Sequence, residues 1–105
     1  EKLPCSEMMF CAILSNVLEN AMHAVQELPE SRRRIGLSLS EKAGHLLLMV
    51  KNPVQTPPVF TDGIPVTERS GHGLGVRSIV YYVEKLHGQY QFRMEDEEFV
   101  VRLIF

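Results

Sequence analysis

Two asparagines and a histidine recur at helical spacing in the stretch AILSNVLENAMHAV. Asn16 and Asn20 lie four residues apart and His23 follows three residues later, so all three share one face of a helix. Asparagine is a poor helix former because its side chain competes for backbone hydrogen bonds, so its repetition asks for a functional reason. The amide oxygen of Asn20 suits Mg²⁺, and His23 can donate a hydrogen bond to a phosphate oxygen. The alternative is that the three side chains simply face water.

A glycine-rich turn is the second feature that could bind a ligand. The stretch SGHGLGVRS places Gly71, Gly73 and Gly75 immediately before an amphipathic segment. Glycines let the backbone approach a ligand closely, and the N–H groups at a helix start favour an anion such as phosphate. The spacing GxGxG differs from the dinucleotide-binding pattern, and no Gly-Lys-Ser/Thr follows as it does in a P-loop. A flexible loop that ends in a tight helix start is the alternative interpretation.

Hydrophobic periodicity predicts the elements that position these residues. We expect one helix from about Glu7 to Leu28 and another from about Val76 to His87, with Gly88 as its C-terminal stop. Residues 52–72 hold four prolines and show no sustained period, so a long loop is expected there. Alternating patterns predict four strands at about 35–39, 46–50, 89–94 and 99–105. This order predicts a two-layer α/β (α+β) sandwich, a single mixed β-sheet with both helices on one face.

Composition favours one soluble globular domain over residues 1–105. At 105 residues and 45% apolar content, the chain can build a modest core. The formal net charge of −2 provides no basic field for nucleic acid or an acidic membrane. Cys5 and Cys11 match neither a CxxC motif nor a disulfide framework, which favours a reducing compartment. The longest purely apolar run, 46–50, is far too short to span a bilayer, so no direct membrane insertion is expected.

Together, the two motifs resemble those of the GHKL ATPases, the superfamily of bacterial histidine kinases, gyrase-type topoisomerases, heat-shock protein ninety and the MutL proteins. LSNVLENAMHAV is similar to the N box, and GHGLGVRSIVYYVEKLHGQY is similar to the G2 box and following helix of histidine kinases. The resemblance covers nearly the whole chain and is greatest to the ATPase domains of Agr-type and citrate-sensor-type kinases. It implies the Bergerat ATP-binding fold, with ATP and Mg²⁺ as ligands.

The resemblance implies a role for each motif residue. Asn20 is expected to ligate the Mg²⁺ that bridges the ATP phosphates, and His23 falls where many kinases have a lysine or arginine near them. Asn16 falls where hydrolysing members carry a glutamate base; an asparagine cannot accept a proton at neutral pH, which favours phosphoryl transfer over hydrolysis. The proline-rich segment at about 53–72 matches the ATP lid. The glycine turn that wraps the phosphates is matched by Gly71, His72, Gly73, Leu74 and Gly75.

One motif departs from the family pattern. The G1 box usually reads Asp-x-Gly-x-Gly, and its aspartate accepts a hydrogen bond from the adenine amino group. Here the equivalent stretch is VKNPVQ, with Asn52 in the place of the aspartate and no glycine. The amide oxygen of Asn52 can still accept that hydrogen bond. Agr-like members show a similar asparagine, so we interpret the change as subfamily variation.

The resemblance therefore implies the catalytic domain of a two-component sensor histidine kinase, which transfers the ATP γ-phosphoryl group to a histidine on a separate dimerisation domain. His23, His45, His72 and His87 all lack an acceptor-like context, so acceptor helices and a membrane sensor are expected upstream. The domain is then expected in the cytoplasm, with a response regulator as a further partner. Two alternatives stay open. One is a non-catalytic GHKL-fold interaction module with a decayed adenine site, and the other is an anti-sigma-factor kinase that phosphorylates a protein serine.

Overall fold

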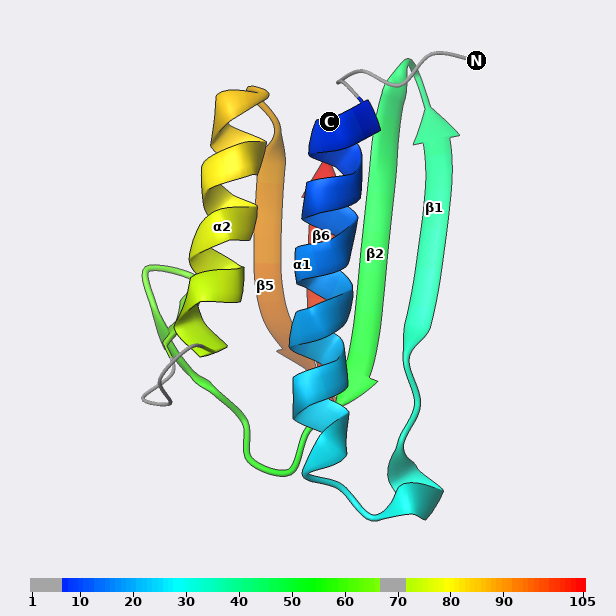
Figure 1. The fold of residues 1–105 in the computed structure, drawn as a ribbon, viewed down its shortest axis with the longest axis vertical. Helices are drawn as coiled ribbons and strands as arrows, with labels where there is room; N and C mark the ends of the chain where they lie inside the picture. Colours follow the sequence, from blue (N-terminus) through cyan, green and yellow to red (C-terminus); the bar gives the residue numbers. More distant parts are fainter. Residues whose placement is uncertain (1–6, 67–71) are drawn as a thin grey trace.

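Two helices pack side by side over one four-stranded sheet (Figure 1). The computed structural model describes residues 7–66 and 72–105, and the side chains of all of these except residues 72–75. The helices are α1 (Glu7–Gln26) and α2 (His72–Lys85). The sheet has the order β1-β2-β6-β5, with β1 (Gly36–Lys42), β2 (His45–Pro53), β5 (Gln89–Glu95) and β6 (Glu98–Ile104). The expected two-layer α+β sandwich is confirmed.

The four-stranded sheet is antiparallel throughout, which corrects the expectation of a mixed sheet. β1 and β2 form one hairpin and β5 and β6 form another, so both pairs are antiparallel. The connection through α2 then lays β6 against β2, again in the opposite direction. The first hairpin turns at Ala43 and Gly44, whose φ angles of 53° and 82° are typical of a type I′ turn.

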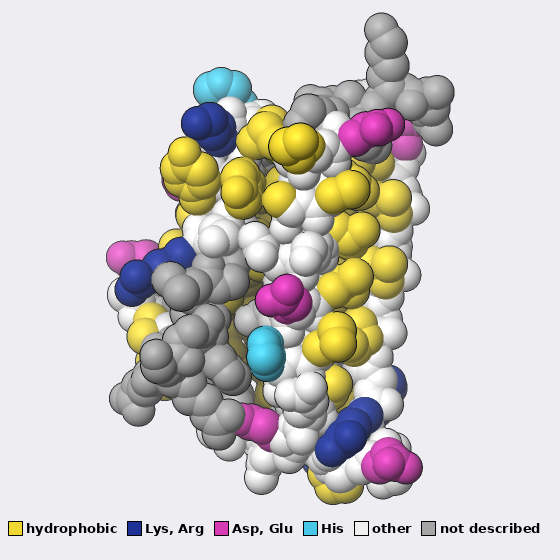
Figure 2. Space-filling model, viewed as in Figure 1, with side chains coloured by type: hydrophobic (Ala, Val, Ile, Leu, Met, Phe, Trp, Pro, Cys, Tyr) yellow, Lys and Arg dark blue, Asp and Glu magenta, His cyan; other side chains and the backbone are white. Residues whose placement is uncertain are grey.

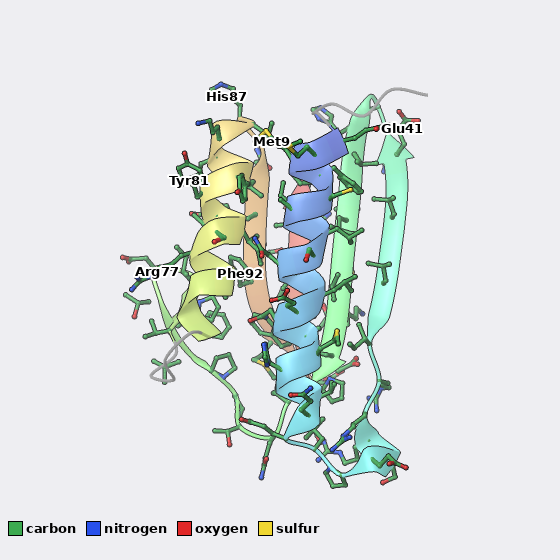
Figure 3. The ribbon with its side chains drawn as sticks, in the orientation of Figure 1. Met9, Glu41, Arg77, Tyr81, His87 and Phe92 are labelled. Carbon is green, nitrogen blue, oxygen red and sulfur yellow. The ribbon has the colours of Figure 1, made fainter. Side chains whose placement is uncertain are left out.

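The core lies between the sheet and the two helices. Side chains alternate along each strand, so one set faces the helices and the other faces solvent. Figure 3 shows Phe92 of β5 directed toward the helix layer, where it is only 4% exposed, and Tyr81 on the outer side of α2, where it is 57% exposed. The most completely buried members of the core are Ile13, Val17, Leu48, Val50, Ile79, Val83 and Leu103.

α1 supplies the apolar stripe that covers β2 and contacts α2. Its buried residues Ile13, Val17, Ala21 and Val25 recur at steps of four, as expected of an amphipathic helix on a sheet. By length and composition alone α1 would pass as a membrane-spanning helix, a test that core helices of globular proteins also pass. It ends at Gln26, two residues earlier than predicted.

α2 begins earlier than the sequence indicated. Glycine is a poor helix former, so the start of the helix was predicted after Gly75. The helix in fact begins at His72 and ends at Lys85. His87 takes the left-handed conformation at its C-terminal end, with φ of 59°, a role that was expected of Gly88. Gly88 is needed for space instead, since a Cβ there would lie 2.5 Å from the carbonyl oxygen of Ile104.

The segment between β2 and α2 contains regular structure that the sequence analysis did not predict. Asp62 and Gly63, with φ of 53° and 79°, form the turn of a short hairpin. The ring of Phe60 lies 6.3 Å from the ring of Phe99 in β6, so the hairpin is anchored to the main core. Its two strands are β3 (Val59–Thr61) and β4 (Ile64–Val66). The segment that was expected to be a long loop therefore contains a regular hairpin at residues 59–66, here called the flap.

The helices leave the outer strand β1 uncovered. Leu37 and Leu39 pair with the buried Val50 and Leu48 of β2, so they lie on the helix side of the sheet. They are nevertheless 54% and 52% exposed. Figure 2 shows hydrophobic side chains gathered beside α1 over β1 and β2.

Candidate functional site

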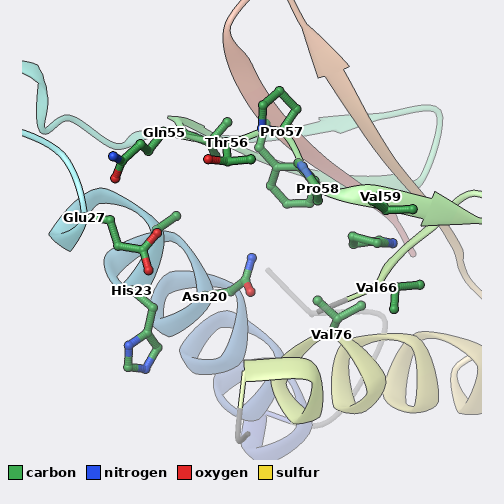
Figure 4. A pocket seen from close by; sticks show the side chains of 14 residues that line it. Asn20, His23, Glu27, Gln55, Thr56, Pro57, Pro58, Val59, Val66 and Val76 are labelled. Carbon is green, nitrogen blue, oxygen red and sulfur yellow. The ribbon is translucent and has the colours of Figure 1, made fainter. Parts of the chain in front are cut away.

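A cleft of about 550 Å³ opens between α1, the flap and the start of α2. This volume is in the range of sites that bind small molecules. One wall consists of residues 54–58, which connect β2 to β3, and of Val59, the first residue of β3. The opposite wall and the far end are formed by Asn20, His23, Ala24, Glu27, Pro65, Val66, Val76 and Phe99 (Figure 4).

The polar wall comes from one face of α1 and the residue that follows its end. Asn20, His23 and Glu27 are separated by three and four residues, so they lie one above the other along the helix. Asn20 is half-buried, whereas His23 and Glu27 are exposed at the rim. The neighbouring face of the helix is fixed in the core through Val17 and Ala21. The wall therefore brings an amide, an imidazole and a carboxylate to one side of the cleft.

The other surfaces of the cleft are largely apolar. Val59 and Val66 pair with each other in the β3–β4 hairpin and both line the cleft, although they are 71% and 49% exposed. Phe99 is 4% exposed and Val76 is 5% exposed, so they contribute a closed apolar surface behind the opening. Apolar walls with a few polar groups are typical of sites that bind small molecules.

The two helix termini give the cleft an electrostatic direction. α2 starts at His72, and the first N–H groups of a helix have no partner within the helix, so its start is a favourable site for an anion. Val76, which follows that first turn, lines the cleft. α1 ends at Gln26, where the helix dipole is negative and where Glu27 adds a carboxylate. The cleft therefore has a positive end and a negative end.

The structure brings together some of the predicted site residues and not others. Asn20 and His23 line the cleft as expected from their spacing. Asn16 is not one of the described residues that line the cleft. It lies one turn before Asn20 on α1, where it is half-buried. Asn52 is also outside that lining. It is 1% exposed, and its Nδ2 donates to the carbonyl oxygen of Pro53 at 3.0 Å.

The glycine turn is described only in part. Gly71 lies outside the described residues. The backbone of His72, Gly73, Leu74 and Gly75 forms the first turn of α2, which directly precedes the lining residue Val76. Their side chains lie outside the description, so their predicted contact with phosphates stays a prediction.

Several lining residues were not identified from the sequence. Glu27 lies seven residues after Asn20, a spacing of two helical turns that could have placed it in the same site. Gln55 and Thr56 fell inside the predicted lid, but no local pattern distinguishes them from their neighbours. Phe99 had no local signal, because its place in the cleft depends on the pairing of β6 with β2.

A cluster of charged side chains lies away from the cleft, on the open face of the sheet. Arg93 Nη2 lies 2.6 Å from Glu95 Oε2, and Lys51 Nζ lies 3.3 Å from Glu95 Oε1. Hydrogen bonds from Arg93 and then Lys51 hold the pKa of the Glu95 carboxyl below its ordinary value of 4.5. This cluster links β2 to β5 across β6, so its role is to hold the strands of the sheet together.

The chain belongs to the GHKL domain family, whose sequence model matches residues 6–105. Solved structures of histidine kinases share its fold. The mycobacterial sensor histidine kinase MprB has a TM-score of 0.71 at 18% identity, over 96% of this chain and 72% of that one. The histidine kinase AdeS of Acinetobacter baumannii has a TM-score of 0.67 at 13% identity, over 96% of this chain and 47% of that one.

A third match is the histidine kinase domain of the Erythrobacter litoralis EL346 blue-light activated histidine kinase. Its TM-score is 0.64 at 20% identity, over 92% of this chain and 45% of that one. The chain thus spans about half the length of the AdeS and Erythrobacter structures. A comparison with curated proteins found no match.

Proposed function

We propose that this chain is the ATP-binding catalytic domain of a two-component sensor histidine kinase, of the Agr-type or citrate-sensor-type subfamily. The observation that carries the proposal is the cleft that Asn20 and His23 of α1 line together with Val76, which follows the first turn of α2. Membership of the GHKL domain family and the fold shared with histidine kinases support it.

The polar side chains that line the cleft fit a nucleoside triphosphate with a divalent cation. Asn20 offers one neutral oxygen ligand, which suits a Mg²⁺ ion that takes its remaining ligands from water and phosphate. The described residues contain no group of three His, Cys, Asp or Glu side chains that could hold a metal ion without the substrate. Mg²⁺, when bound, would offset part of the phosphate charge.

The residues of the chain would orient the triphosphate by its charge. We expect the phosphates at the start of α2, with the turn Gly71, His72, Gly73, Leu74 and Gly75 around them, since unpaired helix N–H groups favour anions. His23 would donate a hydrogen bond to a phosphate oxygen. Asn16 cannot act as a base, so transfer to a protein acceptor is favoured over attack by water. Positioning and electrostatics would supply most of the catalysis.

The segment at about 53–72 would act as the ATP lid, with its β3–β4 hairpin held to the core through Phe60. The acceptor would be a histidine on a separate upstream dimerisation domain, and a response regulator would receive the phosphoryl group from it. The domain would then lie on the cytoplasmic side of a membrane-anchored sensor.

One observation favours a second candidate, a non-catalytic interaction module of the same fold. Asn52, the residue expected to read adenine, is buried and is outside the described lining of the cleft. A module of this kind would retain the fold but would bind no nucleotide.

Titration calorimetry with ATP, with and without Mg²⁺, distinguishes the two candidates. The kinase proposal predicts saturable binding tighter than about 1 mM, equivalent to about −4 kcal/mol, and tighter binding when Mg²⁺ is present. In the full-length protein it also predicts an acid-labile phosphoryl group on histidine. A folded chain that does not bind millimolar ATP in the presence of Mg²⁺ would support the interaction module instead.

A further inference from the structure

The open face of the four-stranded sheet, opposite the helices, carries apolar side chains at its centre. Leu47 and Met49 of β2 and Ile104 of β6 are half-buried, and all three lie outside the core between sheet and helices. Val100 of β6 is 0% exposed and is also outside that core. Leu47 pairs with Ile104 across the two central strands, so their side chains are neighbours on this face. The centre of the open face is therefore a second apolar layer.

The two central strands have the sequence pattern of strands that are covered on both faces. A solvated face of an antiparallel sheet normally gives an alternation of apolar and polar residues. β2 instead has an unbroken apolar run at 46–50, and β6 is apolar over 99–104 apart from Arg102. The outer strands place polar side chains on the open face, among them Ser38 opposite Met49 and Gln91 opposite Arg102. An apolar centre with a polar rim is typical of a protein interaction surface.

Arg102 lies in this apolar centre, between Met49 of β2 and Gln91 of β5. Its Nε is buried, and no atom of the described residues accepts a hydrogen bond from it. The Oε1 of Gln91 is already used, because it accepts a hydrogen bond from Arg93 Nη1 at 2.9 Å. A buried donor that the fold itself leaves unsatisfied is costly and rare, so Arg102 is a candidate for contact with another molecule.

The carboxylates of the open face are already bound to other cations. Glu95 is shared by Lys51 and Arg93. Glu98 lies 3.6 Å from an arginine that precedes β1. The described part of the chain thus supplies no carboxylate for Arg102 at the centre of the face. A planar guanidinium can form two parallel hydrogen bonds with a carboxylate, which is the group that would complement it best.

We propose that the centre of the open face binds a segment of a partner protein that presents an aspartate or glutamate between apolar side chains. The carboxylate binds Arg102, and the apolar side chains of the segment cover Leu47, Met49 and Ile104. The proposal is independent of nucleotide binding, because the cleft is lined by α1 and the flap on the other side of the sheet.

Two other occupants match the charges of this face less well. A second copy of the chain, packed face to face, would bring two Arg102 guanidinium groups together with no free carboxylate between them. An anionic membrane is recognised by clusters of about four to eight basic residues. Here Lys51 and Arg93 are held by Glu95, so the centre of the face offers one cation for one carboxylate.

The test is a selection of random short peptides, displayed on phage, for binding to the immobilised chain. The selected peptides should carry an aspartate or glutamate flanked by apolar residues. Synthetic copies of them should bind Arg102→Gln about tenfold more weakly than the wild-type chain in fluorescence polarisation, since hydrogen bonds to charged groups are lost. Arg77→Gln, an exposed arginine of α2 on the other side of the sheet, is the matched control and should leave the affinity unchanged (Figure 3).

A second variant tests the same surface without altering Arg102. Ser38→Glu places a carboxylate beside Met49 at an exposed position, where it repels the carboxylate of the peptide and should also weaken binding. Thermal unfolding followed by circular dichroism shows whether each variant is folded. If Arg102→Gln does not fold, Ser38→Glu decides.

Three results would overturn the proposal and leave the kinase proposal standing. The first is a set of selected peptides without enriched acidic residues, or with unchanged affinity for the folded variants. The second is Arg102-dependent binding to phosphatidylserine vesicles, which would assign the face to a membrane. The third is an Arg102-dependent dimer in sedimentation equilibrium, which would assign it to a second copy of the chain.

Discussion

Replacement of Asn20 by alanine should uncouple nucleotide binding from Mg²⁺. The half-buried amide lines the cleft and is the one neutral oxygen ligand that α1 presents between His23 and the start of α2. Loss of a polar contact to a charged partner costs about 1.5–3 kcal/mol, which corresponds to about tenfold to a hundredfold weaker binding of ATP with Mg²⁺. Binding of ATP without Mg²⁺ should change much less.

The fold should tolerate this substitution. Asn20 is in the interior of α1, and alanine is the better helix former by about 0.5 kcal/mol, so the free energy of unfolding should not fall measurably. Calorimetric titrations with and without Mg²⁺, together with urea unfolding, measure both effects. Ser15→Ala, at an exposed position on the same helix and outside the described lining, is the control. Equal loss of affinity with and without Mg²⁺, or no loss, would refute the metal assignment.

Two further predictions concern the fold. Gly88→Ala should lower the free energy of unfolding by about 1–3 kcal/mol in urea titrations, because the new Cβ would lie 2.5 Å from a β6 carbonyl oxygen. Gly36→Ala, whose nearest neighbours are 4.0 Å away, is its control and should be nearly neutral. Glu95→Gln should make the free energy of unfolding depend less on pH under acidic conditions. The pKa of Glu95 is lowered by Arg93 and Lys51, so its contribution is present above about pH 4.5 and is lost as the pH falls through the lower, folded-state pKa. Identical pH profiles of the two proteins below that value would contradict this.

Local periodicity was enough to predict that Asn20 and His23 of α1 reach the cleft together. A helix repeats every 3.6 residues, so the spacing of Asn20 and His23 already places them on one face. The alternating patterns likewise predicted the four long strands, since alternation is a property of a single strand. The layer arrangement followed because the apolar faces needed a common core.

The remaining features depend on contacts between distant parts of the chain. The β3–β4 strands are three residues each, too short for a periodic signal, although Asp62-Gly63 is a hairpin turn signal. Asn52 matched a motif position, but its burial depends on the packing around β2. Phe99 reaches the cleft only because β6 pairs with β2.

The central claim is that the cleft beside α1 binds ATP with Mg²⁺. The most direct measurement is a nuclear magnetic resonance titration that follows the backbone amides of the isotope-labelled chain as ATP and Mg²⁺ are added. The account predicts saturable shifts at Asn20, His23, Val76 and residues 54–59, with β1 (Gly36–Lys42) unaffected. Shifts confined to β1, or no saturable shift at millimolar ATP, would contradict it.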